Sequence, residues 1–467
     1  MSELPVGWLP ISLGEVGTLY CGQSPSAADV NSGGMGTPYV TGPEQWDGQH
    51  IHRSKWTTNP RRTVPDGCIF VTVKGAGVGT LFPGIACAIG RDVYAYQPSK
   101  KLDPGFVLNA LTKNIQNVIA QARGTIPGLS KEHILGEIVG LPPLAEQQRI
   151  VAKLDALTAR TAHARAELDR VPVLAERQRQ ALLIKAFSGE LTAEWIASQP
   201  GQQHPVVPRG DQELRAKYRM NEPSEGFDAP YDIPSTWRWL RLPELGDMDR
   251  GKSRHRPRDD ERLFGGPFPF VQTGEVRAAD RYLDSYSKTY SAFGLEQSRL
   301  WPIRTVCITI SANIAETAIL RIEACFPDSV VGFTADETRC LPEFVEYFVR
   351  TAKADLEQFA PATAQKNINL DVLASVRVPV APLAEQGEII RRLDHAFTEI
   401  DRLVAEAAAA RRLLDRLDQQ ILAKAFRGEL VPQDPADEPA SVLLERIRAE
   451  RGAAPETARR GRRSKAA

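Results

Sequence analysis

Two long stretches of the chain have a row of mainly apolar positions at alternating spacings of three and four, broken by polar residues in the first stretch, which is the pattern of a helix with one narrow apolar stripe. The first stretch has this spacing at Val151, Leu154, Thr158, Thr161, Arg165 and Leu168. The second has it at Ile390, Leu393, Phe397, Ile400, Val404 and Ala407, and continues at Leu414, Leu417 and Ile421 after a phase slip near 407–410. Both stretches are rich in residues that favour helix. The pattern therefore predicts two long helices, over residues 144–187 and 382–427.

An isolated helix of this kind would leave its apolar stripe in water, so we expect the two stripes to pack on each other in antiparallel orientation. The predicted helix–helix seam consists of Val151, Leu154, Leu168, Ile390, Leu393, Phe397, Ile400 and Val404. At 1.5 Å per residue, roughly 42 helical residues extend about 60 Å, which suits a spacer. Pro172 lacks an N–H and lies inside the first stretch, which predicts that this helix is split into two pieces.

The helical stretches belong to a longer repeat. Pro-Leu-Ala-Glu-Gln at 143–147 recurs at 382–386, and Lys-Ala-Phe-x-Gly-Glu-Leu at 185–191 recurs at 424–430, so both pairs are 239 positions apart (382 − 143). Pro5, Trp8, Leu13 and Gly22 match Pro234, Trp237, Leu242 and Gly251, 229 positions later (234 − 5). Residues 57–123 and 277–360 share little. A repeat of this length implies two domain-sized halves in which a common frame carries two different surfaces.

The predicted fold class is α+β, with two similar mixed α/β domains separated by an antiparallel coiled coil of two long helices and related by a pseudo-two-fold internal repeat. Residues 1–143 have the short apolar runs between Gly and Pro that are typical of strands, such as 68–74 and 93–96. The predicted domains are a first domain at 1–143, a first helix at 144–187, a connector at 188–232, a second domain at 233–381, a second helix at 382–427 and a C-terminal tail at 428–467.

Composition excludes several classes of protein. No apolar run approaches the roughly 20 residues of a membrane span, and the N-terminus lacks a secretory pattern, so we expect a cytoplasmic location. The six cysteines are scattered without a pair at metal-binding spacing, so no metal site is predicted. Lys plus Arg equals Asp plus Glu at 58 each, so any DNA binding must come from local basic surface or from a partner.

One segment matches a nucleotide-binding motif. Gly246 to Ser253 fits G-x-x-x-x-G-K-S, but Pro257 follows where that motif requires a helix. The aligned first copy, Gly17 to Ser24, keeps the glycines and the serine and lacks the lysine. We interpret the motif as a shared turn and predict no cofactor in this chain. No methyltransferase or nuclease set of residues is found in either half, which favours a binding protein over an enzyme.

The candidate DNA-binding residues lie in the diverged middle of each half. They are His50, His52, Arg53, Lys55, Arg61, Arg62 and Lys74 in the first, and Lys252, Arg254, Arg256, Arg258, Arg277, Lys366 and Asn367 in the second. Arg, Lys and Asn can read base edges in the major groove, while other Lys and Arg neutralise phosphates. A solvated charged face is the alternative for each residue taken singly.

The repeated motifs at 143 and 382 and at 185 and 424 resemble those of the specificity subunits of type I restriction-modification systems. Leu4 to Trp8, Ile233 to Trp237 and Gln365 to Leu370 resemble that family as well, and the similarity covers nearly the whole chain. The resemblance implies a non-catalytic, sequence-specific DNA-binding subunit with two target-recognition domains. Each domain would read one half of a bipartite site in double-stranded DNA, and the helices would set the gap between the halves.

The resemblance also implies partners. Two modification subunits would dock on the helices and use S-adenosylmethionine to methylate adenine, and two restriction subunits would use ATP and Mg²⁺, so these cofactors belong to the partners. Two other functions stay open at this point. The chain can be a coiled-coil protein–protein adaptor without DNA specificity, or an ATP-binding protein that uses Gly246 to Ser253.

Overall fold

The computed structural model describes residues 4–75, 77–121, 128–199, 206–207, 214, 218, 229–311, 314–358 and 368–453. The chain divides into two compact units, one formed by Met1–Asp169 with Ala408–Ala467 and the other by Arg170–Ala407. Each unit contains one globular domain and parts of both long helices.

The first globular domain consists of short strands and helices. Its strands are β1 (Leu9–Ser12), β2 (Gly17–Cys21), β3 (Val30–Asn31), β4 (Thr37–Val40), β5 (Trp56–Thr57), β6 (Thr63–Val64), β7 (Ile69–Thr72), β8 (Leu81–Pro83), β9 (Cys87–Ile89), β10 (Val93–Pro98) and β11 (Ile138–Leu141). Its helices are α1 (Leu13–Val16), α2 (Pro104–Gln121) and α3 (Lys131–Leu135), with the 3-10 turns η1 (Ala27–Asp29) and η2 (Pro43–Gln45). The strands form sheets in the orders β2-β10-β7-β8, β3-β5-β4-β9-β6 and β1-β11.

The central strand β7 is buried on both faces, as its run of apolar residues predicts. Successive side chains of a strand point to opposite faces. Ile69 and Val71 accordingly belong to one buried cluster, which includes Phe106 of α2, while Phe70 belongs to a second cluster with Phe82. The domain therefore has a core on each side of this sheet.

The second globular domain repeats this frame. Its strands are β12 (Arg238–Arg241), β13 (Gly246–Arg250), β14 (Phe264–Phe270), β15 (Tyr282–Leu283), β16 (Lys288–Tyr290), β17 (Val306–Thr309), β18 (Thr317–Leu320), β19 (Val330–Ala335) and β20 (Arg377–Val380). Its helices are α7 (Leu242–Leu245), α8 (Thr273–Ala278), α9 (Ala292–Glu296), α10 (Pro342–Gln358) and α11 (Leu370–Ser375), with the turn η4 (Glu261–Leu263). The sheets have the orders β12-β20, β13-β19-β17-β18-β15 and β14-β16.

The internal repeat is visible in the strand registers. In the first domain Leu9 of β1 lies opposite Leu141 of β11, and in the second Arg238 of β12 lies opposite Val380 of β20. These are the positions that the sequence offsets of 229 (238 − 9) and 239 (380 − 141) relate to each other. The predicted fold class is confirmed, because two similar mixed α/β domains accompany two long helices.

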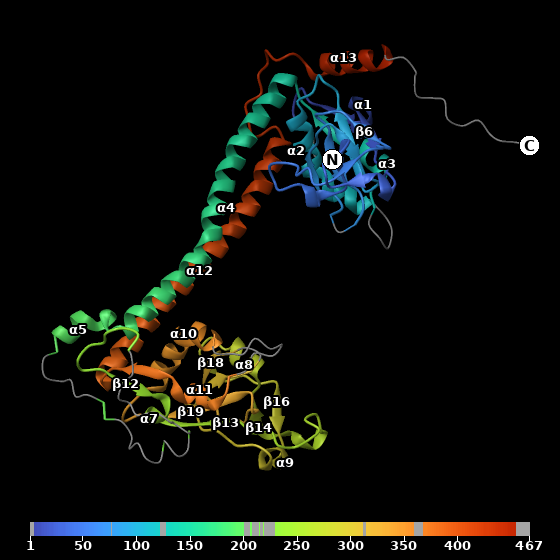
Figure 1. Ribbon diagram of the computed structural model, residues 1–467. Coiled ribbons are helices and arrows are strands. Elements are labelled where there is room, and N and C mark those ends of the chain that lie inside the picture. Colours follow the sequence, from blue (N-terminus) through green and yellow to red (C-terminus); the bar gives the residue numbers. More distant parts are fainter. Residues whose placement is uncertain are drawn as a thin grey trace, which may run out of the picture. The chain divides into compact units, whose positions relative to one another are not determined.

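The long helices are α4 (Leu144–Phe187) and α12 (Leu383–Ala425), and each is a single continuous helix (Figure 1). The prediction that Pro172 splits the first helix was wrong, because α4 continues through this residue. The proline is exposed, so its ring occupies no space in the seam, while Ala175 in the next turn is buried. Packing along the buried face holds the helix where the local preference would end it.

The two helices are antiparallel within each unit. In the first unit Arg165 of α4 contacts Asp415 at 3.1 Å and Asp418 at 2.6 Å, and Asp169 contacts Arg411 at 3.3 Å. Residue numbers thus rise along α4 as they fall along α12. In the second unit Arg179 contacts Asp401, and Arg392 donates to the carbonyl of Leu191, just beyond α4, at 2.7 Å.

Burial along the helices locates the seam. Of the predicted seam residues, Leu154, Leu393 and Ile400 are buried, and Val151, Leu168, Ile390, Phe397 and Val404 are half-buried. The expected phase slip on α12 was wrong, because the less exposed positions run on as 400, 404, 407, 411, 414 and 418 without a break. Leu417 is consequently exposed, and the polar residues Arg411 and Asp418 occupy the seam.

Each long helix is followed within three residues by a glycine in the left-handed backbone conformation, Gly189 with φ 85° and Gly428 with φ 71°, as is common after a helix C-terminus. After Gly189 come η3 (Glu190–Thr192) and α5 (Ala193–Ala197). After Gly428 the predicted C-terminal tail contains an unexpected helix, α13 (Ala440–Ala453), whose Leu443, Leu444 and Ile447 join the core of the first domain. No helix in the described part of the chain is long and apolar enough to span a membrane.

Candidate nucleic-acid interface

The candidate basic residues of the first domain surround β5 and β6. His50, His52 and Arg53 lie on an exposed loop that precedes β5, and the carboxylate of Asp47 holds this loop by accepting the main-chain N–H of His50 at 2.6 Å. Within this loop, His52 is also paired with Asp47 at 2.9 Å. The loop therefore has a defined conformation that exposes polar side chains to solvent.

The remaining basic candidates of the first domain differ in their partners. Lys55 donates to the hydroxyl of Thr41 at 2.9 Å, which ties it to the domain surface. Arg62 is half-buried, and its Nε has no hydrogen-bond partner among the described residues. Arg61 and Lys74 are exposed, and no ion pair is found for either in the described part of the chain. Arg53, Arg61 and Lys74 are therefore the cations of this domain that are most available to a ligand.

The basic candidates of the second domain lie mainly in the loop after β13. Arg258 is paired with Asp328 at 3.2 Å, and Arg256 donates to the carbonyls of Ser253 at 2.6 Å and His255 at 2.8 Å, so both shape the loop. Arg254 is exposed, and its side chain has no partner within the ranges that the structure describes. Lys252 is half-buried.

Three further candidates of the second domain are less informative. Arg277 lies exposed on α8 and already has an interaction partner. Lys366 and Asn367 lie outside the described residues.

A pocket of about 160 Å³ lies between the strand pair β14–β16 and the loop after β13. Its walls include Phe264, Phe270 and Tyr290, the last two stacked with ring centroids 4.1 Å apart. Lys288 and Arg258 supply positive charge, and the remaining lining residues are Ser253, Gln272, Thr273, Pro327 and Ser329. No acidic side chain is among the lining residues, and Arg258 is already paired with Asp328, so Lys288 is the cation that makes the pocket suitable for an anionic group.

The sequence did not single out Lys288, Gln272 and Tyr290 of this pocket. The signal that could have found them is the likeness of 38–40 (Pro-Tyr-Val) to 269–271 (Pro-Phe-Val), which marks a strand of the common frame beside the diverged region. The pairing of that strand with β16 was not readable, because the register between β14 and β16 shifts between Phe264 and Phe268.

The first domain has a more open cavity of about 500 Å³ near η2 and the end of β7. It is lined by Lys74 but also by Glu44 and Asp92, and the buried hydroxyl of Thr72 has no hydrogen-bond partner among the described side chains. Its two carboxylates disfavour an anionic ligand. The two domains thus differ in the chemistry of the surfaces that they present.

The domains are fixed to the helices by the repeated motif. Trp8 donates its indole N–H to Glu146 at 3.1 Å, and Trp237 does the same to Glu385 at 2.9 Å. Both carboxylates are buried, and burial raises the pKa of each above its usual range, although these hydrogen bonds act in the opposite direction.

The glutamine that follows in the motif makes two further hydrogen bonds between each domain and its helix. Gln147 donates to the carbonyl of Pro142 at 3.0 Å and accepts the main-chain N–H of Asp103 at 3.1 Å. Gln386 donates to the carbonyl of Ala381 at 2.8 Å and accepts the main-chain N–H of Leu341 at 2.9 Å. The motif therefore joins each globular domain to the start of its helix through these hydrogen bonds.

The second repeated motif, at 185–191 and 424–430, packs the end of each long helix against the globular domain of the other copy. Phe187, at the end of α4, packs on Phe344 of the second domain with ring centroids 5.1 Å apart. Phe426, just after α12, packs on Phe106 of the first domain at 5.2 Å. Each unit is consequently assembled from both copies of the repeat.

The segment that matches the nucleotide-binding motif has the wrong geometry for that role. Gly246 to Arg250 form the strand β13 itself, paired with β19, whereas a phosphate loop joins a strand to a helix. An irregular loop follows it up to Asp260. This geometry does not support the ATP-binding alternative.

The cysteines and acidic residues form no metal site in the part of the chain that the structure describes. The six cysteines are unpaired, and all except Cys21 are buried. Burial raises the pKa of Cys68 and of Cys87 to about 12, which keeps both thiols protonated and unreactive.

Comparisons with known proteins give a consistent result. The family model described as "Type I restriction modification DNA specificity domain" matches residues 5–172 and again 234–406. The type I restriction enzyme EcoDI specificity subunit of Escherichia coli is 27% identical over 476 residues, covering 97% of each chain.

Solved structures with the same fold exist. A chain of the structure described as "Structural basis underlying complex assembly and conformational transition of the type I R-M system" aligns with a TM-score of 0.70 and 20% identity, covering 92% of this chain and 100% of that one. The crystal structure of the HsdS subunit from Thermoanaerobacter tengcongensis aligns with a TM-score of 0.57 and 21% identity, over 92% and 98% of the two chains.

Proposed function

Because this chain belongs to the family defined by the type I restriction modification DNA specificity domain, we propose that it is the specificity subunit of such a complex and that each globular domain reads one half of a bipartite DNA site. The chain itself carries out no catalysis. The partner subunits bind and use S-adenosylmethionine, ATP and Mg²⁺.

One observation carries the proposal. The two halves keep the same hydrogen bond between domain and helix, Trp8 to Glu146 and Trp237 to Glu385, while the pockets of the two domains differ in charge and size. A protein that reads two unlike sequences with one frame needs this combination. An adaptor without DNA specificity has no need of a pocket lined by Lys288, Arg258 and stacked aromatic rings and without acidic residues.

The available cations are the proposed DNA contacts. Arg53, Arg61 and Lys74 serve the first half-site, and Lys252, Arg254 and Lys288 serve the second. The near-zero net charge of the chain is compatible with this role, because partner subunits can supply further phosphate contacts.

The helices set the gap between the half-sites and dock the two modification subunits. The helix pair in the second unit exposes Val173 and Leu174 of α4 and Leu403 of α12, each with more than half of its surface accessible. Contiguous exposed apolar side chains mark protein-binding surfaces, and we propose that a modification subunit covers these three.

The decisive experiment is an exchange of the segment of each domain that lies between the repeated glycine, Gly22 or Gly251, and the helix α2 or α10. Residues 23–100 of the first domain are replaced by the matching segment of another specificity subunit, which leaves Trp8 and Phe106 in contact with Glu146 and Phe426. Methylome sequencing of cells that produce the chimaera with its modification subunit should show a change in one half of the methylated motif. The matched exchange of residues 252–338 should change the other half. A change in both halves from one exchange would contradict the two-reader function.

A further inference from the structure

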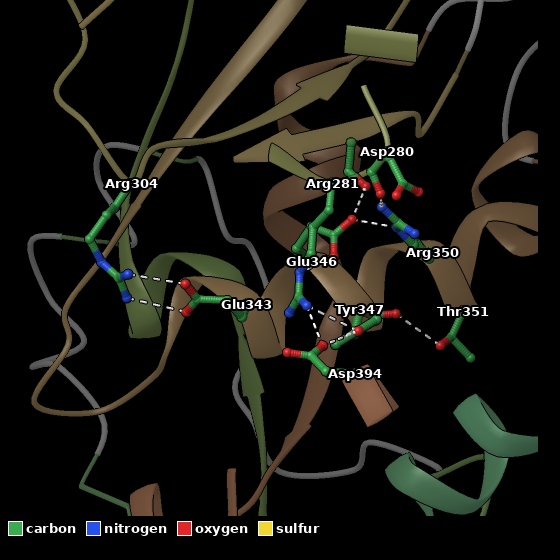
Figure 2. A network of polar contacts seen from close by, with 10 residues as sticks. Asp280, Arg281, Arg304, Glu343, Glu346, Tyr347, Arg350, Thr351 and Asp394 are labelled. Carbon is green, nitrogen blue, oxygen red and sulfur yellow. Dashed lines mark hydrogen bonds and ion pairs between the residues drawn. The ribbon is translucent and has the colours of Figure 1, made fainter. Parts of the chain in front are cut away.

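A cluster of charged side chains joins the second globular domain to α12 (Figure 2). Arg281, directly before β15, donates to the carboxylate of Asp394 on α12 and to the hydroxyl of Tyr347 on α10 at 3.1 Å. The Tyr347 hydroxyl donates to the same carboxylate. Asp394 therefore accepts hydrogen bonds from two side chains of the globular domain.

The cluster extends into the interior of the domain. The Arg281 side chain is 11% exposed and lies 4.2 Å from the centre of the Tyr347 ring. Behind it the fully buried Glu346 accepts a hydrogen bond from Thr317 at 2.9 Å and pairs with Arg350. Burial raises the pKa of Glu346, whereas the charges of Arg350 and Arg281 lower it.

Apolar packing is incomplete beside this cluster. A cavity of about 660 Å³ separates the domain from the helix pair there, with Tyr282 and Arg350 on the domain side and Leu183, Arg179 and Phe397 on the helix side. At this edge of the interface the polar cluster joins the domain to α12 together with the edge-to-face contact of Tyr347 with Phe397, whose ring centroids are 5.6 Å apart.

Among the residues that the structure describes, the first half of the chain has no equivalent of this cluster. Helices α2 and α10 both begin at a proline, Pro104 and Pro342, and this alignment places Leu108 and Asn109 where the second domain has Glu346 and Tyr347. Asp155, 239 positions before Asp394, is exposed and has no ion pair among the described residues. The cluster is therefore an addition to the second half and not part of the common frame.

Stability alone does not account for the cluster. Buried ion pairs contribute little net stability relative to apolar side chains, because the cost of removing two charges from water offsets their attraction. Arg281 Nε and Nη2 and Glu346 Oε2 have no hydrogen-bond partner in the described part of the chain. The hydrogen bonds between a guanidinium and a carboxylate are directional. They therefore favour one orientation of the domain relative to the helix.

We propose that Arg281 and Asp394 are positioning residues that hold the second recognition domain in one orientation on α12 and thereby restrict the gap allowed between the two half-sites. This inference rests on the proposed function. One added base pair moves a half-site by about 3.4 Å and rotates it by roughly 34°, since a turn of DNA contains 10 to 10.5 base pairs. A firmly oriented domain cannot follow that rotation, whereas a loosened domain follows it.

The test compares the full chain, with its modification subunit, carrying Asp394→Asn or Asp155→Asn. Methylation rates are measured on duplexes with the native gap and with one base pair added or removed. Wild type and Asp155→Asn should share one strong preference for the native gap. Asp394→Asn should lower that preference about tenfold while it keeps the discrimination against altered half-sites, because the reading surface is unchanged.

The possible results distinguish the positioning role of Asp394 from the proposed function of the chain. A folded, active Asp394→Asn subunit with the wild-type preference overturns the positioning role. If that variant fails to fold, Tyr347→Phe removes one hydrogen bond to Asp394 and must still lower the preference at least twofold; an unchanged preference overturns the role in the same way. Methylation by wild type that is indifferent to the second half-site would instead contradict the proposed function.

Discussion

Phe426 packs on Phe106 with their ring centroids 5.2 Å apart, although 320 positions (426 − 106) separate them in the sequence. The equivalent contact in the other unit joins Phe187 to Phe344 at 5.1 Å. In both cases the end of a long helix contributes its aromatic side chain to the core of a domain from the other copy. Each copy of the repeat therefore contributes the end of its long helix to the unit that contains the globular domain of the other copy.

This arrangement predicts which unit each aromatic residue stabilises. Phe426→Ala should destabilise the first unit, and Phe187→Ala the second, each by about 3 to 5 kcal/mol, because a large buried side chain is lost and a cavity remains. Limited proteolysis with mass spectrometry should show faster cleavage within 4–121 for Phe426→Ala and within 229–358 for Phe187→Ala. The reverse assignment of cleavage sites would show that this arrangement is absent in solution.

The buried carboxylate of Glu385 predicts a pH dependence of stability. Burial raises its pKa above the usual value of 4.5 in the folded state, so the folded chain holds this proton more tightly than the unfolded chain does. The stability that it contributes is full below pH 4.5 and falls as the pH rises through the folded-state pKa. Melting temperatures of wild type minus those of Glu385→Gln should therefore be larger at pH 5 than at pH 7.5. The exposed Glu190→Gln serves as the control for the removal of a carboxylate elsewhere in the second unit.

Arg254 is expected to contact DNA directly. Its side chain is exposed and without a partner among the described residues, so Arg254→Ala should weaken binding to the second half-site by roughly 1 to 3 kcal/mol if a base edge is lost. If a phosphate contact is lost instead, binding weakens for all sequences and the salt slope falls by about one. Fluorescence anisotropy at several salt concentrations measures both. Arg402→Ala, an exposed arginine paired on α12 with Glu399 at 2.9 Å, should change neither.

The helices are expected to determine the length of the unread gap. An insertion of seven residues into α4 before Pro172, together with seven into α12 after Ala407, keeps the phase of the seam and adds about 10.5 Å of helix. The gap in the methylated motif should grow by about three base pairs when the double insertion is combined with Asp394→Asn, since DNA rises 3.4 Å per pair and the loosened domain can follow the accompanying rotation of about 100°. Methylome sequencing gives the gap directly. An unchanged gap in a folded double-insertion variant with Asp394→Asn would remove the spacer function, and insertion into α4 alone should abolish methylation because the seam is displaced.

Much of the fold was predictable because it depends on local patterns and on the repeat. The spacing of three and four located both long helices to within two residues, and the recurring motifs at 143 and 382 marked the points where domains meet them. Free cations could not be told from paired ones, because Arg258 and Arg254 look alike in the sequence. Only the fold brings Asp328 to Arg258 and leaves Arg254 exposed.

The sequence by itself determined the duplication, the class of fold and the two long helices, since periodicity and repetition can be read from the order of the residues alone. The tertiary structure decided the rest: the unbroken course of α4 through Pro172, the helix α13 in the core of the first domain, the pocket beside Tyr290 and the contact of Arg281 with Asp394. Each of these depends on residues that lie far apart in the chain, and their burial and pairing arise only when the whole chain has packed.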